Sequence, residues 1–221
     1  SSNHGHAYMG YTNLALSMYR QLEPNNRFAR LNDQITDALA RRLAQAPHGM
    51  IDTYPGEAYP PDMSAVIGSI ALHDRATHSV EHRIVLQKVL QIFRKQFVDP
   101  SSGLVFQSMD AKSGRIVDNP RASGTTLSAY FLSFADAELA KTLFQAIQSK
   151  QQITIMGLKG VREYPTGQEG RGDVDSGPLI LGASPTASVF AMSGARIFGD
   201  RPLFASLYRS MDLFGSFSDH K

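Results

Sequence analysis

The feature that most limits the fold of this chain is a degenerate repeat of helix pairs. In each pair the hydrophobic residues recur at helical spacing, and a short turn with an acidic residue joins the two helices. These turn residues, Glu23, Asp74, Asp136 and Asp200, are 51, 62 and 64 residues apart. The first helix of each pair is rich in small residues, and the second is longer or more amphipathic. Such a pattern predicts an all-α toroid or solenoid with the small residues on a crowded inner layer.

The long segments between the helix pairs are expected to collect at one end of the array. One of them, 98–121, is predicted to contain a short β-hairpin in which 104–106 and 115–117 are the strands. We therefore expect one domain, residues 1–221, folded as an incomplete (α/α)6-type barrel of about four helix hairpins that lacks the first helices of the full ring. The expected helices cover 7–22, a stretch between Asn26 and His48, 62–73, 79–97, 123–134, 136–149, 184–198 and 201–213.

The composition excludes several classes of function. The absence of cysteine excludes a disulfide, a thiolate zinc site, an iron–sulfur cluster and a cysteine nucleophile on this chain. A net charge of +2 does not favour nucleic acid or an anionic membrane as a partner. The uncharged run 176–195 contains two prolines and three glycines, so we expect no membrane span. The compartment stays open, with a bacterial periplasm or cell envelope favoured over the cytoplasm.

The loop 51–62 is rich in carboxylates and tyrosines. Aromatic rings stack on the apolar faces of sugars, and carboxylates bind hydroxyl groups or act as acid and base, so this composition is typical of a sugar-binding cavity. For Asp62 the N-cap of the following helix is an equally strong interpretation, because aspartate is a favoured cap. The polar residues in question are Asp52, Tyr54, Glu57, Tyr59 and Asp62.

The glycine-rich segment 157–182 is the second candidate loop. Its Asp173 and Asp175 would face one side of an extended strand, with Val174 anchoring the other side. That arrangement suits an acid/base pair, a hydroxyl clamp or a calcium site, although the acid ladder of an EF-hand is missing. The same segment contains Arg162, Glu163 and Tyr164.

No metal and no cofactor are predicted. The seven histidines form no HExxH motif and no ligand triad, and we expect His73, His78 and His82 at the surface near a helix turn. The chain also lacks a phosphate-binding loop with its lysine and a GxSxG elbow. In the loop before the fifth helix, Arg121 is placed to reach a carboxylate of the cavity.

Four short runs resemble the linalool dehydratase-isomerase family in their order and spacing. They are Tyr8–Leu14, Asp99–Gly103, Asp173–Gly177 and Ala195–Asp200, and the resemblance extends over about residues 6–205. It implies an α/α toroid with the active site in the central cavity. Members of that family have helices before the region matched here, which implies that a missing segment or a second chain completes the ring.

The departures from that family concern its chemistry. The resemblance places Asp52 and Asp62 where the family has two cysteines in the corresponding loop, and Tyr11 where it has a histidine. Thiol-based chemistry on terpene alcohols is therefore not expected here. An α/α toroid whose cavity contains carboxylates and tyrosines is more similar to the glycosidases and polysaccharide lyases of the same architecture. This similarity is an analogy at the level of the fold.

We expect an enzyme that acts on a carbohydrate or a similar polyhydroxylated substrate. Asp52, Asp62 and Asp175 are predicted to be its acid/base carboxylates and to line one cavity. Two alternatives are a hydratase, dehydratase or isomerase of a small alcohol, and a non-catalytic binding or assembly module. The residues predicted to bind the substrate are Tyr11, Tyr54, Glu57, Tyr59, Arg162, Glu163, Tyr164 and Asp173.

Overall fold

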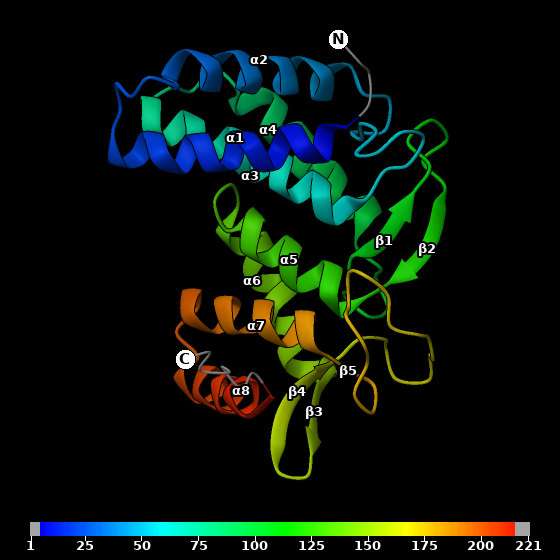
Figure 1. Ribbon diagram of the computed structural model, residues 1–221. Helices are drawn as coiled ribbons and strands as arrows, with labels where there is room; N and C mark the ends of the chain where they lie inside the picture. Colours follow the sequence, from blue (N-terminus) through cyan, green and yellow to red (C-terminus); the bar gives the residue numbers. More distant parts are fainter. Residues whose placement is uncertain (1–4, 215–221) are drawn as a thin grey trace, which may run out of the picture.

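The structure, a computed structural model, describes residues 5–214 and is mostly helical (Figure 1). Two small antiparallel sheets accompany the helices. The helices are α1 (His6–Leu22), α2 (Ala29–Gln45), α3 (Pro60–Thr77), α4 (Arg83–Ile92), α5 (Ala122–Leu132), α6 (Ala137–Ala146), α7 (Pro185–Ile197) and α8 (Arg201–Phe214). The strands are β1 (Phe106–Met109), β2 (Ile116–Pro120), β3 (Gln152–Ile155), β4 (Leu158–Arg162) and β5 (Ala183–Ser184). Two π-helical turns, η1 (Phe93–Phe97) and η2 (Ile147–Gln151), extend α4 and α6.

The odd-numbered helices α1, α3, α5 and α7 form an inner row in which each packs beside the next (Figure 1). Small residues permit the close approach: Gly10 of α1 faces Val66 of α3, and Gly68 of α3 lies against the carbonyl group of Phe131 on α5. Every residue from Pro60 to Ile70 is buried, because α3 has neighbours on all sides. The predicted inner layer of small residues is therefore present.

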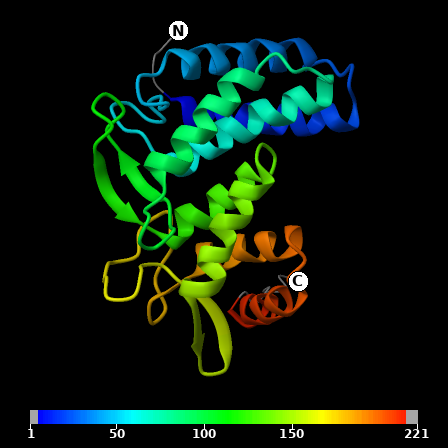
Figure 2. The same cartoon turned by 180° about the vertical axis from the view of Figure 1, so that it is seen from behind.

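The even-numbered helices form the outer row: α4 and α6 lie behind the inner helices, α2 lies beside α1, and α8 lies beside α7 (Figures 1 and 2). Their large side chains fill the space between the rows, and Phe93 and Phe97 after α4 and Phe144 on α6 are almost completely buried. This distribution of large outer and small inner side chains is what two packed layers of helices require. No helix within residues 5–214 combines the length and the apolar character needed to cross a membrane.

A buried hydrogen-bond network joins α1 to α2 and α3. Asn13 of α1 donates to Thr36 Oγ1 and to Ser69 Oγ, in both cases at 3.0 Å. Asn32 of α2 donates to Asn13 Oδ1 at 2.8 Å and to Ser17 Oγ at 2.9 Å. Because buried polar groups are costly unless they are paired, these bonds favour one register of the first three helices.

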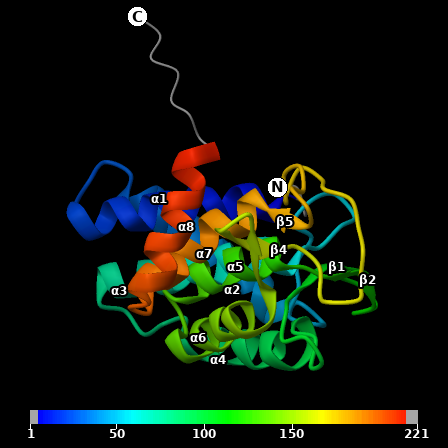
Figure 3. The ribbon, with the colours of Figure 1, turned by 90° about the horizontal axis from the view of Figure 1, so that it is seen from below.

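The inner helices all run in the same direction, so their N-termini, the strands and the long loops lie at one end of the molecule (Figure 1). Among residues 5–214 the four hairpins form an open arc that does not close into a ring. Figure 3 shows the molecule from the end at which α7 and α8 lie, with α4 and α6 on one side of the inner helices. The sequence predicted both the four hairpins and the collection of long loops at one end.

One β-hairpin was predicted and a second was not. The predicted hairpin is present as β1 and β2, with Ser108 opposite Asp118. The second, formed by β3 and β4, overlaps the start of the segment that we expected to be a glycine-rich loop. Its turn residues Met156 and Gly157 have φ values of 50° and 82°, the two positive values typical of a tight hairpin turn.

The acidic turn residues differ in what they do. Asp136 accepts a hydrogen bond from the backbone N–H of Leu139 at 2.9 Å, which caps α6.

The prediction that His73 and His82 are surface residues was wrong. Both are buried, because Asp33 of α2 contacts His73 and the carboxylate of Asp74 contacts both rings.

Replacing Gly68 by alanine should destabilise the fold, although alanine is the better helix former. A Cβ here would lie 2.5 Å from the Phe131 carbonyl oxygen, a backbone atom that cannot rotate away. Overpacking of this kind typically costs about 1–3 kcal/mol in the free energy of unfolding. Gly10→Ala should also destabilise the fold, because its Cβ would lie 2.6 Å from Cγ2 of the buried, β-branched Val66 and 3.2 Å from the backbone nitrogen of Val66. Chemical denaturation measures both, and a Gly68→Ala variant as stable as the native chain would contradict the close contact of α3 and α5.

Candidate active site

A cavity of about 640 Å³ lies at the loop end of the inner helices. The first turns of α3, α5 and α7 form its walls, together with α1, β1, the loop before α3 and the segment before β5. Helix N-termini carry a partial positive charge, so this end of the array favours acidic groups. The lining residues are Tyr11, Tyr54, Glu57, Tyr59, Pro61, Asp62, Gln107, Ser123, Gly124, Leu127, Phe131, Val174, Asp175, Thr186 and Phe190.

Asp62 is the most deeply buried carboxylate of this cavity. It stands in the first turn of α3, whose N-cap is Tyr59, so Asp62 is not the N-cap that one interpretation of the sequence suggested. The hydroxyl of Tyr11 donates to Asp62 Oδ1 at 2.8 Å. Burial raises the pKa of Asp62, and the nearby charge of Asp175 raises it further, whereas the hydrogen bond from Tyr11 opposes the shift.

Asp175 faces the same cavity from the glycine-rich segment. The side-chain amide of Gln107 on β1 donates to Asp175 Oδ2 at 2.8 Å. Burial raises the pKa of Asp175, and the negative charge of Asp173 adds to this effect. Gln107 is a site residue that the sequence did not indicate, since a glutamine in a short strand has no distinctive spacing. Its buried Oε1 has no hydrogen-bond partner within residues 5–214.

Two tyrosines from the loop 51–62 stand at the cavity, as predicted. The rings of Tyr54 and Tyr59 meet edge to face with their centres 5.6 Å apart, and Tyr59 donates to Glu57 Oε2 at 3.2 Å. Burial and the charge of Glu57 raise the pKa of Tyr59 to about 12. Both tyrosines are therefore neutral at physiological pH and present aromatic faces and hydroxyl donors to a ligand.

Arg121 holds the glycine-rich segment in place. Its guanidinium group donates to Asp173 and to Asp118 and lies over the ring of Tyr164, 5.6 Å from the ring centre. Asp173 also accepts hydrogen bonds from the backbone N–H groups of Asp175 and Ser176. The sequence indicated that Arg121 would reach a carboxylate, and the structure identifies two.

The local geometry around Asp173 differs from the prediction. The segment forms a turn at residues 174–176 instead of an extended strand, so Asp173 and Asp175 contact different partners. Val174 is 95% exposed and anchors nothing. Asp173 and Tyr164 organise the loop and are not among the residues that line the cavity.

Glu163 is completely buried behind the cavity wall. Its carboxylate accepts hydrogen bonds from the hydroxyl and the backbone N–H of Ser123, in the first turn of α5. Burial raises the pKa of Glu163, although the hydrogen bonds from Ser123 and Ser184 oppose the shift. Glu163 thus joins β4 to the N-terminus of α5 and does not face the cavity.

Asp52 lies apart from Asp62 and Asp175. It lines a second, smaller cavity of about 270 Å³, together with His6 and Arg42, and its carbonyl oxygen accepts a hydrogen bond from the backbone of His6. Arg162, at the end of β4, lines neither cavity. Of the three carboxylates predicted to share one site, the structure brings two together.

No family model matches the sequence, and no curated protein is similar to it. The resemblance to the linalool dehydratase-isomerase family therefore has no support from these comparisons. Solved structures do match the fold, among them α/α-toroid glycoside hydrolases of families GH8 and GH76 at low sequence identity.

Three of these structures illustrate the similarity. A GH76 α-mannanase from Bacteroides thetaiotaomicron matches with a TM-score of 0.61 and 12% identity, over 93% of this chain and 56% of that one. An inactive α-1,6-mannanase variant from Salegentibacter sp. HEL1_6, in complex with α-1,6-mannotetraose, has a TM-score of 0.58 and 15% identity, over 97% and 63%. An endo-β-1,4-glucanase from Acetobacter xylinum has a TM-score of 0.56 and 14% identity, over 82% and 59%. The chain thus spans about six-tenths of the length of these proteins, and the similarity confirms the α/α-toroid fold.

Replacing Glu163 by glutamine should make stability less dependent on pH. The raised pKa means that the folded protein binds this proton more tightly than the unfolded chain does. The contribution to stability is therefore present at low pH and is lost as the pH rises through the raised pKa. Glutamine does not titrate, and its amide can keep both contacts with Ser123. Thermal unfolding of both proteins is the measurement, and the stability of Glu163→Gln relative to the native chain should increase as the pH rises from about 4 to about 8. A stability difference that is the same at every pH would contradict the raised pKa of Glu163.

Proposed function

We propose that this chain is part of an enzyme that acts on a carbohydrate or a similar polyhydroxylated substrate by acid/base chemistry. One observation is central to the proposal. Two carboxylates with raised pKa values, Asp62 and Asp175, come from separate elements and line a single cavity that also contains three tyrosines. A pair of carboxyl groups on opposite sides of a glycosidic bond is what hydrolysis of that bond requires.

The environments of the two carboxylates suggest different roles. Asp62 is the more buried, and its raised pKa suits a general acid that gives a proton to the leaving oxygen. Asp175 is more exposed and is oriented by Gln107, which suits the carboxylate that activates water or attacks the sugar. The general acid must hold its proton at the working pH, and a buried carboxyl group does so more readily than an exposed one.

Recognition of a polyhydroxylated substrate would use the remaining polar groups of the cavity. Tyr54 and Tyr59 offer ring faces on which the apolar side of a sugar can stack. The unpaired Oε1 of Gln107 is suited to accept a hydrogen bond from a substrate hydroxyl, because a buried acceptor without a partner is costly until it is satisfied. The structural neighbours act on mannan and glucan, as their names state, and this similarity of fold supports the substrate class by analogy.

Asp62→Asn and Asp175→Asn should each lower kcat by about 10²–10⁴-fold while the fold stays intact, because each removes a group that transfers protons. Both asparagines can still accept the existing hydrogen bonds from Tyr11 and Gln107. Release of reducing ends from α-1,6-mannan, β-1,4-glucan and related polysaccharides is the measurement. Asp52→Asn is the control and should keep its activity, since Asp52 lies in the other cavity. Full activity of Asp62→Asn would disprove the proposal, and oligosaccharide binding without turnover by the native chain would favour a binding module.

Tyr11→Phe should shift the pH dependence of turnover in one direction. The hydroxyl of Tyr11 stabilises the ionised form of Asp62, so its removal raises the pKa of Asp62 further. A general acid works only when protonated, and the basic limb of the pH–rate profile should therefore move to higher pH. A profile measured for the native chain and the variant tests this, and a basic limb that stays in place would assign the acid role to another group.

A second candidate function is the hydration, dehydration or isomerisation of a small alcohol. Leu127, Phe131 and Phe190 form an apolar wall beside Tyr11, whose ring centre lies 5.6 Å from that of Phe131. Such a wall suits a hydrocarbon substituent better than a hydroxylated ring. Turnover of small unsaturated alcohols that disappears in Asp62→Asn, with no release of reducing sugars, would favour this reaction over the first.

A further inference from the structure

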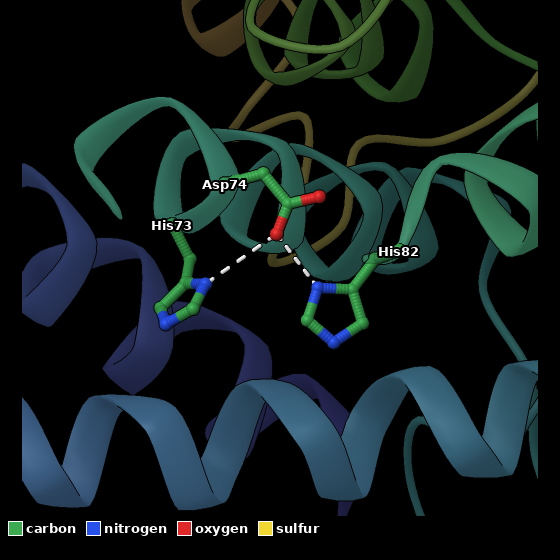
Figure 4. A group of neighbouring side chains, drawn as sticks. All are labelled: His73, Asp74 and His82. Carbon is green, nitrogen blue, oxygen red and sulfur yellow. Dashed lines mark hydrogen bonds and ion pairs between the residues drawn. The ribbon is translucent and has the colours of Figure 1, made fainter. Parts of the chain in front are cut away.

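A second group of chemically active side chains lies at the opposite end of α3 from the cavity. His73 and Asp74 stand in the last turns of α3, and His82 is the N-cap residue of α4 (Figure 4). All three are buried, with 5%, 8% and 6% of their surface exposed. About eleven residues separate Asp62 from His73 along the helix, roughly 16 Å at 1.5 Å per residue, so this group takes no part in the proposed reaction.

The two imidazole rings point toward one carboxylate oxygen (Figure 4). His73 Nδ1 lies 3.5 Å and His82 Nδ1 lies 2.6 Å from Asp74 Oδ1. These three potential ligand atoms are all within 4.8 Å of one another. Two nitrogens and one carboxylate oxygen therefore converge on a small buried volume.

The outer nitrogens of both rings face further carboxylates, on α2. His73 Nε2 lies 2.8 Å from Asp33 Oδ1, and His82 Nε2 lies 3.4 Å from Asp37 Oδ1. A neutral imidazole has a single N–H, so it can donate to only one of its two carboxylate neighbours. With the proton on Nε2, each Nδ1 lone pair faces an Asp74 oxygen that is itself an acceptor. Either a second proton on each ring or a metal ion between the three atoms removes both of these unfavourable contacts.

We propose that His73, Asp74 and His82 form a binding site for a divalent transition metal ion, with Zn²⁺ as the best match. Neutral imidazole nitrogens and a carboxylate oxygen are common zinc ligands, and bond lengths of about 2.0–2.2 Å in a tetrahedral site place the ligand atoms about 3.3 Å apart. The ligand atoms now lie between 2.6 and 4.8 Å apart, so binding requires rotation of the side chains to even out these distances. Asp33 and Asp37 supply the outer carboxylates that orient metal-binding histidines in many zinc proteins.

The site joins three elements that are otherwise held by helix packing. His73 and Asp74 belong to α3, His82 belongs to the turn that leads into α4, and the orienting aspartates belong to α2. A metal ion bound here would stabilise the folded chain by mass action, since the ligands come together only on folding. With three protein ligands, the fourth position of the tetrahedron would be filled by a water molecule, and the ion would hold the turn after α3 against α2.

Titration of Zn²⁺ into chelator-treated protein tests the site. Calorimetry should give one tight site per chain, and the midpoint of thermal unfolding should rise with Zn²⁺ and fall with chelator. His82→Ala should abolish this binding. Asp37→Asn should weaken it by about 10–100-fold, because it removes only an orienting group. His78→Asn is the matched control: it removes an exposed histidine of the same turn, keeps a residue that tolerates the left-handed φ of 55°, and should leave Zn²⁺ binding unchanged.

A second measurement applies if His82→Ala does not fold. Co²⁺ added to the native chain should give the strong visible absorption of a four-coordinate ion, and Zn²⁺ should displace it. No Zn²⁺ binding by the native chain, or binding that is equal in His82→Ala and His78→Asn, would overturn the proposal. The cluster would then be a network of imidazolium and carboxylate groups held by protons alone.

Discussion

Backbone contact between the parallel inner helices is the constraint on which the rest of this structure depends. Glycine at positions 10 and 68 lets α1, α3 and α5 approach until a backbone meets a neighbouring helix. Large side chains are then left to the outer row, where they fill the space between the layers. Because the inner helices are parallel, their N-termini gather at one end, and the long loops can only gather there too (Figure 1). The position of the cavity follows from packing and not from the chemistry of the loops.

In the loop beside the cavity, two aspartates separated by a single residue have opposite pKa shifts, and only the second, Asp175, lines the cavity. Asp173 pairs with Arg121 and accepts several hydrogen bonds, which outweigh its burial and lower its pKa. Burial and the charge of Asp173 raise the pKa of Asp175, and they outweigh the opposing effects of Gln107 and the more distant Arg121. Pairs of carboxyl groups whose environments separate their pKa values are typical of acid/base sites. Arg121 therefore has two effects: it fixes the loop, and it keeps Asp173 ionised, so that the charge of Asp173 raises the pKa of Asp175.

Much of the fold could be predicted from the sequence, because hydrophobic spacing and turn residues are local signals. The four hairpins and the β1–β2 hairpin were predicted from these signals. The β3–β4 hairpin was missed because its turn, Met156-Gly157, lacks the usual Asn-Gly signature. The separation of Asp52 from Asp62 and the burial of His73 depend on how distant elements pack, which spacing along the chain does not contain. The role of Gln107 likewise depends on a contact between residues 68 positions apart.

The open arc has a consequence for how function and folding are linked. Each inner helix packs mainly against its immediate neighbours, so the array is close to one-dimensional, and arrays of this kind can unfold locally. The cavity, however, draws residues from the inner helix of all four hairpins: Tyr11, Asp62, Ser123 and Thr186 stand on α1, α3, α5 and α7. Local unfolding of any one hairpin would remove a wall of the cavity. The shape of the cavity therefore depends on all four hairpins, although each inner helix packs mainly against its neighbours.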